Sequence, residues 1–118
     1  MSAILIIDDD DSMRSSLWHM VKRMGHQVEC AATLREGLEK AATGAFDVVL
    51  LDVSMPDGNG LDVLPDIQRT PAEPEVIIIT GYGNPDSAGP VITKLYERLT
   101  KIQTGDYEDR HGWLYRIV

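Results

Sequence analysis

The chain has almost no cysteine. Cys30 is the single cysteine among 118 residues, so no disulfide can form within one chain. A chain without a disulfide framework suits a reducing compartment, and we expect a cytoplasmic protein.

Repeats and low-complexity segments are absent as well. The length is sufficient for one domain and too short for two, which predicts a single domain over residues 1–118.

Long hydrophobic runs are also missing. The apolar run after Met1 covers only Ala3–Ile7 and meets four aspartates, whereas a signal sequence needs a longer apolar core after a basic start. No stretch approaches the length of a transmembrane helix. The sequence therefore predicts neither a signal peptide nor a membrane partner.

Basic residues are few. Lys and Arg number 11 against 19 Asp and Glu, which gives a formal net charge of -8. An acidic balance argues against direct binding to nucleic acid or to an anionic membrane. It does not exclude a DNA-binding domain fused to this chain or carried by a partner. The composition, 43% hydrophobic and 25% charged, is ordinary for a globular protein.

The chain does contain an apolar run that ends in a carboxylate. Residues 46–51 are mostly apolar and rich in β-branched residues, which is typical of a strand covered on both faces. The run stops at Asp52, and Pro56, Gly58 and Gly60 then mark a loop. In open α/β sheets, ligands bind at the carboxyl ends of the strands. The alternative is that Asp52 caps a turn or starts a helix.

A second apolar run, Ala3–Ile7, ends in four aspartates beginning at Asp8. If the two strands are parallel neighbours, Asp8, Asp9 and Asp52 converge, and their like charges need a counter-charge. A hard divalent cation such as Mg²⁺, held by oxygen ligands, meets that need. The alternative is a solvated helix N-terminus. That alternative suits the third and fourth aspartates better than Asp8, which directly follows the strand.

Helical and strand patterns alternate as far as residue 80, which predicts a parallel sheet with helices on both faces. The first helix follows the aspartates with Asp11 or Ser12 as N-cap, and it stops at Gly25. Weak strand character follows at residues 26–31. The remaining features are a capping box at Thr33 and Glu36, a helix end at Gly44, a helix over residues 60–69 with Pro65 near its first turn, and a strand at residues 76–79.

Three segments together carry a resemblance to a known family. They read IIDDDDSMR, LLDVSMPDGNGLDVL and VIIITGYGNPDSA. This combination resembles the receiver domain of bacterial two-component response regulators over residues 3–88. The ITGYG segment is similar to receivers of activators that work with sigma-54 polymerase. The resemblance implies an α/β fold with a doubly wound parallel sheet of flavodoxin-like order 2-1-3-4-5.

The resemblance also implies a site. In the family, the aspartate at the position of Asp52 accepts a phosphoryl group from a kinase histidine. Asp8 and Asp9 would hold Mg²⁺ with Asp52 and the backbone carbonyl of Ser54. Thr80 would donate to a phosphoryl oxygen and act as the switch residue, although it could also be an ordinary strand-end residue. The implied partners are a sensor histidine kinase and an effector domain, in the parent protein or in trans.

The segment 89–118 departs from the family, and its C-terminal element is atypical. Receivers carry a Lys-Pro after the fifth strand, and this chain has no Lys-Pro. Lys101 lies near the expected spacing from Thr80, but Ile102 follows it. We favour a helix over residues 91–102 followed by an apolar strand at 113–118. The competing interpretation places the fifth strand at residues 96–101 and a helix at 106–118.

Two functions of different classes fit these observations. The first is a phosphoacceptor receiver with no enzymatic activity beyond its own phosphorylation and dephosphorylation. The second is a pseudo-receiver that acts as a phosphate-independent interaction module, which the missing Lys-Pro favours. A phosphatase with an aspartyl nucleophile fits less well, because Ser54 stands where such enzymes carry a second acid. The apolar tail also predicts a homodimer.

Overall fold

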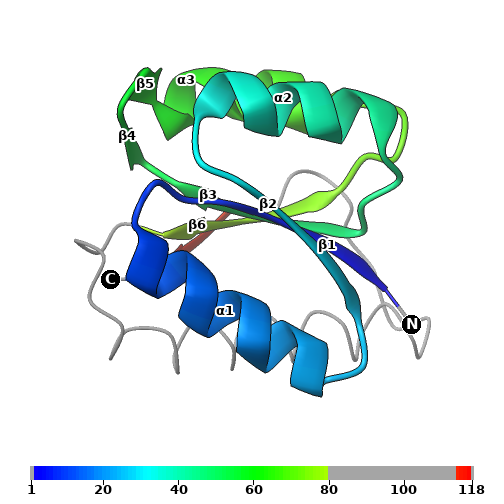
Figure 1. Cartoon of the computed structure of the whole chain (residues 1–118). Coiled ribbons are helices and arrows are strands. Elements are labelled where there is room, and N and C mark those ends of the chain that lie inside the picture. Colours follow the sequence, from blue (N-terminus) through cyan, green and yellow to red (C-terminus); the bar gives the residue numbers. More distant parts are fainter. Residues whose placement is uncertain (1, 80–113, 118) are drawn as a thin grey trace.

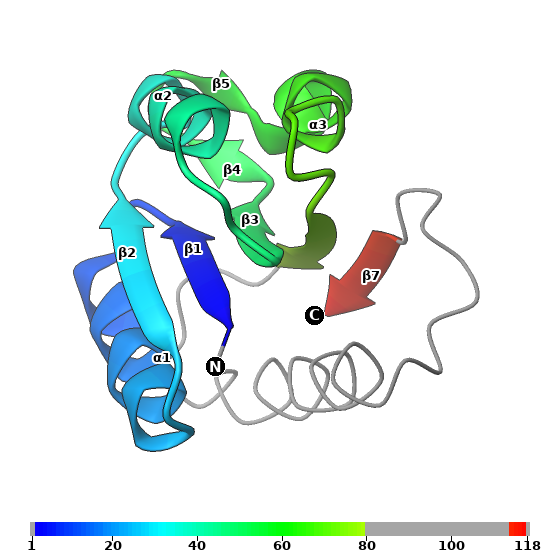
Figure 2. The same cartoon turned by 90° about the vertical axis from the view of Figure 1, so that its right-hand side faces the viewer.

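Five parallel strands form the central sheet of the protein, which we describe from a computed structural model covering residues 2–79 and 114–117. The sheet order is β2-β1-β3-β6-β7. Helix α1 covers one face, and α2 and α3 cover the other (Figures 1 and 2). The strands are β1 Ala3–Ile7, β2 Gln27–Ala31, β3 Val48–Asp52, β6 Glu75–Ile79 and β7 Leu114–Ile117.

This order confirms the predicted doubly wound sheet. The five parallel strands, numbered in chain order, run 2-1-3-4-5, with β6 as the fourth and β7 as the fifth. The two remaining strands, β4 (Ser54–Met55) and β5 (Gly58–Asn59), form a small antiparallel hairpin outside this sheet. That hairpin occupies the segment in which proline and glycine predicted a loop.

Helix α1 (Asp11–Arg23) begins one or two residues earlier than predicted. Its N-cap is Asp10, whose carboxylate accepts a hydrogen bond from the N–H of Met13 at 2.7 Å. The predicted N-cap, Asp11 or Ser12, is therefore wrong, because both residues already have helical backbone. The predicted stop is confirmed: Gly25 has φ +86°, a conformation that costs glycine least.

Helix α2 (Leu34–Thr43) begins with the predicted pair of Thr33 and Glu36, although the return bond goes to the residue before the N-cap. Thr33 accepts from the N–H of Glu36 at 3.1 Å, and Glu36 in return accepts from the N–H of Ala32 at 2.9 Å. Helix α3 (Gly60–Gln68) follows Asn59 as N-cap. Pro65 lies in the second turn of α3 rather than near the first, so one helical N–H donor is missing there.

Alternate residues of each central strand point to opposite faces and fill two separate hydrophobic layers. In β1, Ile4 and Ile6 pack against α1, whereas Leu5 and Ile7 pack toward α2 and α3. Strand β3 divides in the same way, and all five of its residues are buried. Burial on both faces explains why these strands read as continuous apolar runs.

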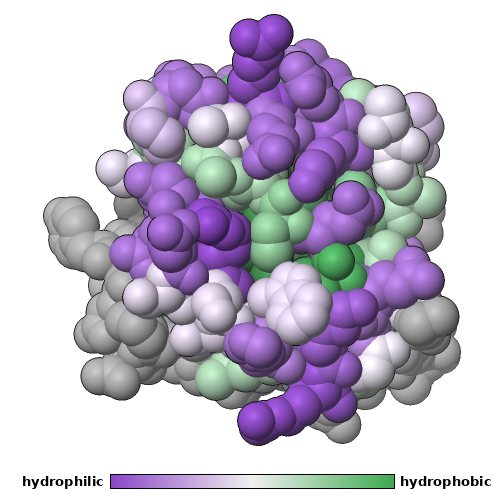
Figure 3. Space-filling model, in the orientation of Figure 1, coloured by the Kyte–Doolittle hydropathy of each residue, from purple (hydrophilic) through white to green (hydrophobic). Residues whose placement is uncertain are grey.

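The strand β2 forms one edge of the sheet and faces the viewer in Figures 1 and 3. Apolar surface is visible in the middle of Figure 3, between hydrophilic surfaces above and below. Half-buried Val28 and Cys30 alternate with exposed Gln27 and Glu29 along this strand. The ammonium of Lys40 donates to the Cys30 carbonyl at 2.5 Å, which covers part of the open edge.

The C-terminal strand β7 pairs in parallel with β6, with Val76 opposite Leu114 and Ile79 opposite Ile117. The predicted strand at residues 113–118 is thus confirmed over 114–117, and the competing helix at 106–118 is wrong there. The predicted helix over 91–102 lies outside the described residues. Within residues 2–79 and 114–117, no helix has both the length and the apolar character needed to span a membrane.

Candidate functional site

Three carboxylates meet at the carboxyl ends of β1 and β3. The two strands are parallel neighbours with Ile7 opposite Leu51, so the residues that follow, Asp8 and Asp52, lie side by side. Asp9 joins them, and one carboxylate oxygen from each of the three lies within 4.8 Å of the others. Asp8 and Asp52 are only 1% and 5% exposed, whereas Asp9 is exposed.

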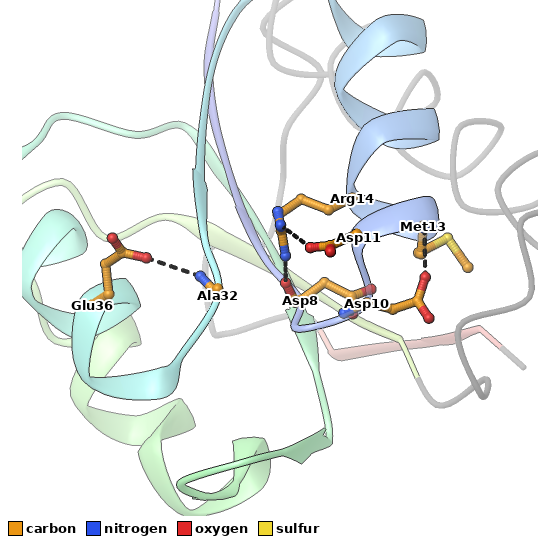
Figure 4. Close-up of polar contacts among 7 residues, drawn as sticks. All are labelled: Asp8, Asp10, Asp11, Met13, Arg14, Ala32 and Glu36. Atoms are coloured by element: carbon orange, nitrogen blue, oxygen red, sulfur yellow. Dashed lines mark hydrogen bonds and ion pairs between the residues drawn. The ribbon is translucent and has the colours of Figure 1, made fainter.

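The backbone around Asp8 is held from several sides (Figure 4). Its N–H donates to the carbonyl of Ala31 in β2 at 3.0 Å. Its carbonyl accepts from the guanidinium of Arg14 at 2.8 Å, and Arg14 also pairs with Asp11. One carboxylate oxygen of Asp8 accepts from the N–H of Asp10 at 3.0 Å. These bonds fix the position of Asp8 at the end of β1.

The loop after β3 folds back on Asp52. The N–H of Ser54 donates to the Asp52 carboxylate at 3.2 Å, and the N–H of Gly60 donates to the Val53 carbonyl at 2.7 Å. A Cβ on Gly60 would collide with the carbonyl oxygen of Asp52, so this close approach requires glycine. Buried Met55 packs into the hydrophobic layer on the α2 and α3 side. Residues 53–60 therefore form a closed unit attached to Asp52, which we call the acceptor loop.

The tip of the acceptor loop contacts helix α2. One carboxylate oxygen of Asp57 accepts from the N–H of Leu34 at 2.9 Å, and the other accepts from the N–H of Arg35 at 3.0 Å. These backbone hydrogen bonds lower the pKa of the Asp57 carboxyl. Both N–H groups belong to the first turn of the helix, where no helical acceptor exists.

Burial makes the site unfavourable for negative charge. Desolvation raises the pKa of Asp52 to about 7, the charge of Asp8 adds to the rise, and the N–H of Ser54 opposes it. Desolvation likewise raises the pKa of Asp8, against the bond from Asp10. Two adjacent carboxylates that lose their hydration in this way are stabilised in the charged form by a nearby cation.

The donor set fits a hard divalent cation. Three carboxylates offer oxygen ligands within a small space, two of them buried and one open to solvent. The nearby guanidinium of Arg14 donates to the Asp8 carbonyl and to Asp11 rather than to these three carboxylates. The acidic pocket can therefore bind a metal ion, and carboxylate oxygens are the ligands that hard divalent cations take.

The structure brings together Asp8, Asp9 and Asp52, as the sequence predicts. Ser54 follows in β4, where its N–H points at Asp52. The other two predicted site residues, Thr80 and Lys101, lie outside the described residues.

Sequence reasoning missed two residues that hold the site. Arg14 had a usable signal, since it stands three residues after Asp11 on one helix face. Asp57 had none, because its bonded partners lie 23 and 22 residues earlier in the chain.

Comparisons with known proteins agree with this geometry. The family model of the response regulator receiver domain matches residues 4–101. The chain is 35% identical over 82 residues to the acid tolerance regulatory protein ActR of Rhizobium meliloti (strain 1021), covering 70% of this chain and 42% of ActR. It is 37% identical over 84 residues to the response regulator protein PilR of Pseudomonas aeruginosa, covering 71% of this chain and 19% of PilR. The chain thus spans less than half the length of these curated relatives.

Solved structures show the same fold. A CheY-like receiver domain protein from Methanospirillum hungatei JF-1 matches with a TM-score of 0.77 at 25% identity, covering 89% of this chain and 98% of that one. The response regulator TrrA from Thermotoga maritima, solved in complex with Mg(2+)-BeF, matches with a TM-score of 0.70 at 26% identity, covering 86% and 98%. With the family model, the parallel sheet and the acidic site in agreement, this chain belongs to the receiver domains of two-component response regulators.

Proposed function

We propose that residues 1–118 form a single receiver that accepts a phosphoryl group on Asp52 and passes the change to an effector. The observation that carries the proposal is the convergence of Asp8, Asp9 and Asp52 within 4.8 Å at the end of the central strand β3. Asp52 is the member that ends this strand and that the acceptor loop surrounds. This position supports the assignment of Asp52 as the acceptor.

The proposed step is a phosphoryl transfer from a kinase histidine. A carboxylate oxygen of Asp52 forms a bond to phosphorus while the bond between phosphorus and the histidine nitrogen breaks. The departing imidazole keeps the electron pair. Such transfers depend on positioning and on neutralising charge more than on covalent chemistry by the protein. The bonds described above supply positioning, since the Ser54 N–H orients the Asp52 carboxylate and the Gly60 N–H holds the carbonyl of the next residue, Val53.

We assign Mg²⁺ as the cofactor, held by Asp8, Asp9 and Asp52 with the Ser54 carbonyl. When bound, Mg²⁺ offsets the charge of the carboxylates and of the incoming phosphoryl group. The Mg(2+)-BeF complex of TrrA, a structure similar to this chain, supports the assignment. Thr80 is the proposed donor to a phosphoryl oxygen, and Lys101 is the candidate for the basic residue that contacts it.

The proposed partners follow from the relatives. ActR and PilR are regulatory proteins more than twice as long as the matched segment, which supports a kinase upstream and an effector domain, in the same protein or in trans, in the cytoplasm. We also propose that the chain forms a homodimer. Within the described ranges, β7 pairs with β6 alone, and an outer strand of this kind offers a surface for a second copy.

A second candidate is a pseudo-receiver that binds partners without phosphorylation. The absence of a Lys-Pro sequence favours it, because receivers use that lysine to contact the phosphoryl group. The two candidates differ in one measurable property, which is whether Asp52 becomes phosphorylated.

Intact-mass analysis after incubation with acetyl phosphate and Mg²⁺ tests the proposal. We expect the native chain to gain one phosphoryl group and Asp52→Asn to gain none. Asp62→Asn, which changes an exposed carboxylate on α3, should behave like the native chain. Uptake by Asp52→Asn at the native rate would show that the acceptor is elsewhere. No uptake by the native chain would favour the pseudo-receiver.

A further inference from the structure

We propose that Asp57 is a positioning residue for the site: by bonding to the start of α2, it holds the acceptor loop in the conformation that places Ser54 and Asp52. The inference rests on the proposed function, because it assigns Asp57 a part in the phosphoryl transfer at Asp52. Asp57 itself touches none of the three site carboxylates in any hydrogen bond described above.

The bond between the acceptor loop and α2 uses both oxygens of one carboxylate. They accept from the consecutive N–H groups of Leu34 and Arg35 at 2.9 and 3.0 Å. The third free N–H of this turn, on Glu36, is bonded by Thr33, the helix's own N-cap. Thr33 and Asp57 therefore bond different N–H groups at the start of α2, and among the hydrogen bonds of the described residues it is Asp57 that joins this turn to the acceptor loop.

The acceptor loop depends on this outside support. Its hairpin has strands of only two residues each, with Ser54 opposite Asn59 and Met55 opposite Gly58. Isolated hairpins are at best marginally stable in water, even when they are longer. The base is fixed by buried Met55 and by the Gly60 bond to Val53. The tip is held by the Asp57 carboxylate, which accepts from the N–H groups of Leu34 and Arg35 in α2.

The conformation of the acceptor loop determines two features of the site. The Ser54 N–H reaches the Asp52 carboxylate at 3.2 Å, a long bond that a small shift of the hairpin would break. The Ser54 carbonyl, the proposed fourth ligand of Mg²⁺, belongs to the same short strand. Loss of the tip contact should therefore loosen both the orientation of Asp52 and the ligand set.

The test compares Asp57→Ala with two matched controls in the full chain. Thr33→Ala removes the other N-terminal bond of α2 without touching the acceptor loop. Asp62→Ala removes an exposed negative charge from α3. Three quantities are measured for each variant: amide hydrogen exchange at Ser54 by NMR, the Kd for Mg²⁺ by calorimetry, and the rate of phosphoryl uptake from acetyl phosphate.

We expect Asp57→Ala to speed exchange at Ser54 by about fivefold. It should weaken Mg²⁺ binding about tenfold, as loss of an outer support of a metal ligand typically does, and slow phosphoryl uptake. Both controls should stay within about twofold of the native chain in all three quantities. Asp57→Asn keeps one acceptor oxygen and should lie between the native chain and Asp57→Ala.

The outcomes separate this inference from the proposed function. If the native chain takes up phosphoryl and Asp57→Ala matches Thr33→Ala at Ser54 and in the Kd for Mg²⁺, the inference is wrong and the function stands. If the native chain takes up none while Asp57→Ala still speeds exchange at Ser54 and weakens Mg²⁺ binding, the function is wrong and the positioning role stands. An unchanged exchange rate at Ser54 in Asp57→Ala overturns the inference in every case.

Discussion

Titration of the Asp52 carboxyl makes the free energy of unfolding depend on pH. Its ordinary pKa is 3.8, and burial with the neighbouring charge of Asp8 raises it to about 7. Between about pH 4 and 7 the folded chain therefore binds more protons than the unfolded chain, so the free energy of unfolding falls as the pH rises through this window. We expect a loss of roughly 1–3 kcal/mol between pH 5 and 8 without metal, after allowing for solvent screening.

Thermal unfolding in a chelator at a series of pH values measures this dependence. Asp52→Asn should lose most of the slope, because its side chain does not titrate. Burial lowers the pKa of His26, which gives a slope of the opposite sign near its own pKa. That contribution is common to both proteins and cancels in the difference. A difference that does not change between pH 5 and 8 would contradict the raised pKa of Asp52.

At the scale of single elements, α2 lies unusually close to β1. A Cβ built on Gly37 would stand 2.5 and 2.8 Å from the Cδ1 and Cγ1 atoms of Ile7. Alanine in a helix gains about 1 kcal/mol over glycine, whereas overpacking a core costs about 1–3 kcal/mol. The second effect is the larger, and we expect Gly37→Ala to lower the free energy of unfolding by about 1 kcal/mol.

A double-mutant cycle identifies the cause of that loss. Ile7→Val removes Cδ1, the nearer of the two atoms that the new methyl group would meet, and keeps Cγ1. The pair Ile7→Val and Gly37→Ala should therefore be more stable than the two separate losses predict, by about 0.5–1 kcal/mol. Denaturant unfolding of the four proteins gives the coupling energy. Simple additivity would mean that the contact with Cδ1 is not the cause of the loss.

The elements that sequence reasoning predicted best are those with local signals. β1, the pair of Thr33 and Glu36 and the helix end at Gly44 depend on residues adjacent in the chain, and the structure places them as predicted. The strand-end positions of Asp8 and Asp52 followed from abrupt changes between apolar and acidic residues. Convergence of the three carboxylates needed only the rule that parallel strands end at the same edge.

The elements that sequence reasoning missed depend on tertiary contacts. The predicted N-cap of α1 lies one or two residues too late, because four consecutive aspartates give no local preference, and the N-cap in the structure is Asp10. Pro56 and Gly58 predict a loop, but such residues mark turns without showing that the residues beside them pair as β4 and β5. Pro65 lies farther into α3 than predicted. The packing of Ile67 in the core helps to stabilise the helix at this point.

For the whole molecule, binding of Mg²⁺ should stabilise the fold. At about one hundred times its Kd, the ion adds roughly 2.7 kcal/mol to the free energy of unfolding, or about 10 °C in Tm for a chain of this size. Asp9→Ala is the informative variant, because Asp9 is exposed and its loss leaves the core intact. Its Tm should respond much less to millimolar Mg²⁺. An equal response in both proteins would place the ion elsewhere.

Sedimentation at micromolar concentration tests the proposed homodimer. We expect a dimer without phosphorylation, and little change on adding beryllofluoride and Mg²⁺, because the proposed contact is at β7 and not at Asp52. Asp52→Asn should sediment like the native chain. A native monomer that dimerises only with beryllofluoride would instead indicate an ordinary phosphorylation switch.

The residues of β1 alternate between two hydrophobic layers, and this alternation limits the insertions and deletions that the strand can tolerate. Deleting one codon within Ala3–Ile7 would turn Ile4 and Ile6 from the α1 side to the other face and shift Asp8 relative to Asp52. Only a two-residue change restores the alternation, and it moves Asp8 by about 7 Å along the strand. Insertions and deletions in homologues of this chain should therefore avoid β1 and collect between elements, where neither the layers nor the carboxylates depend on the count of residues.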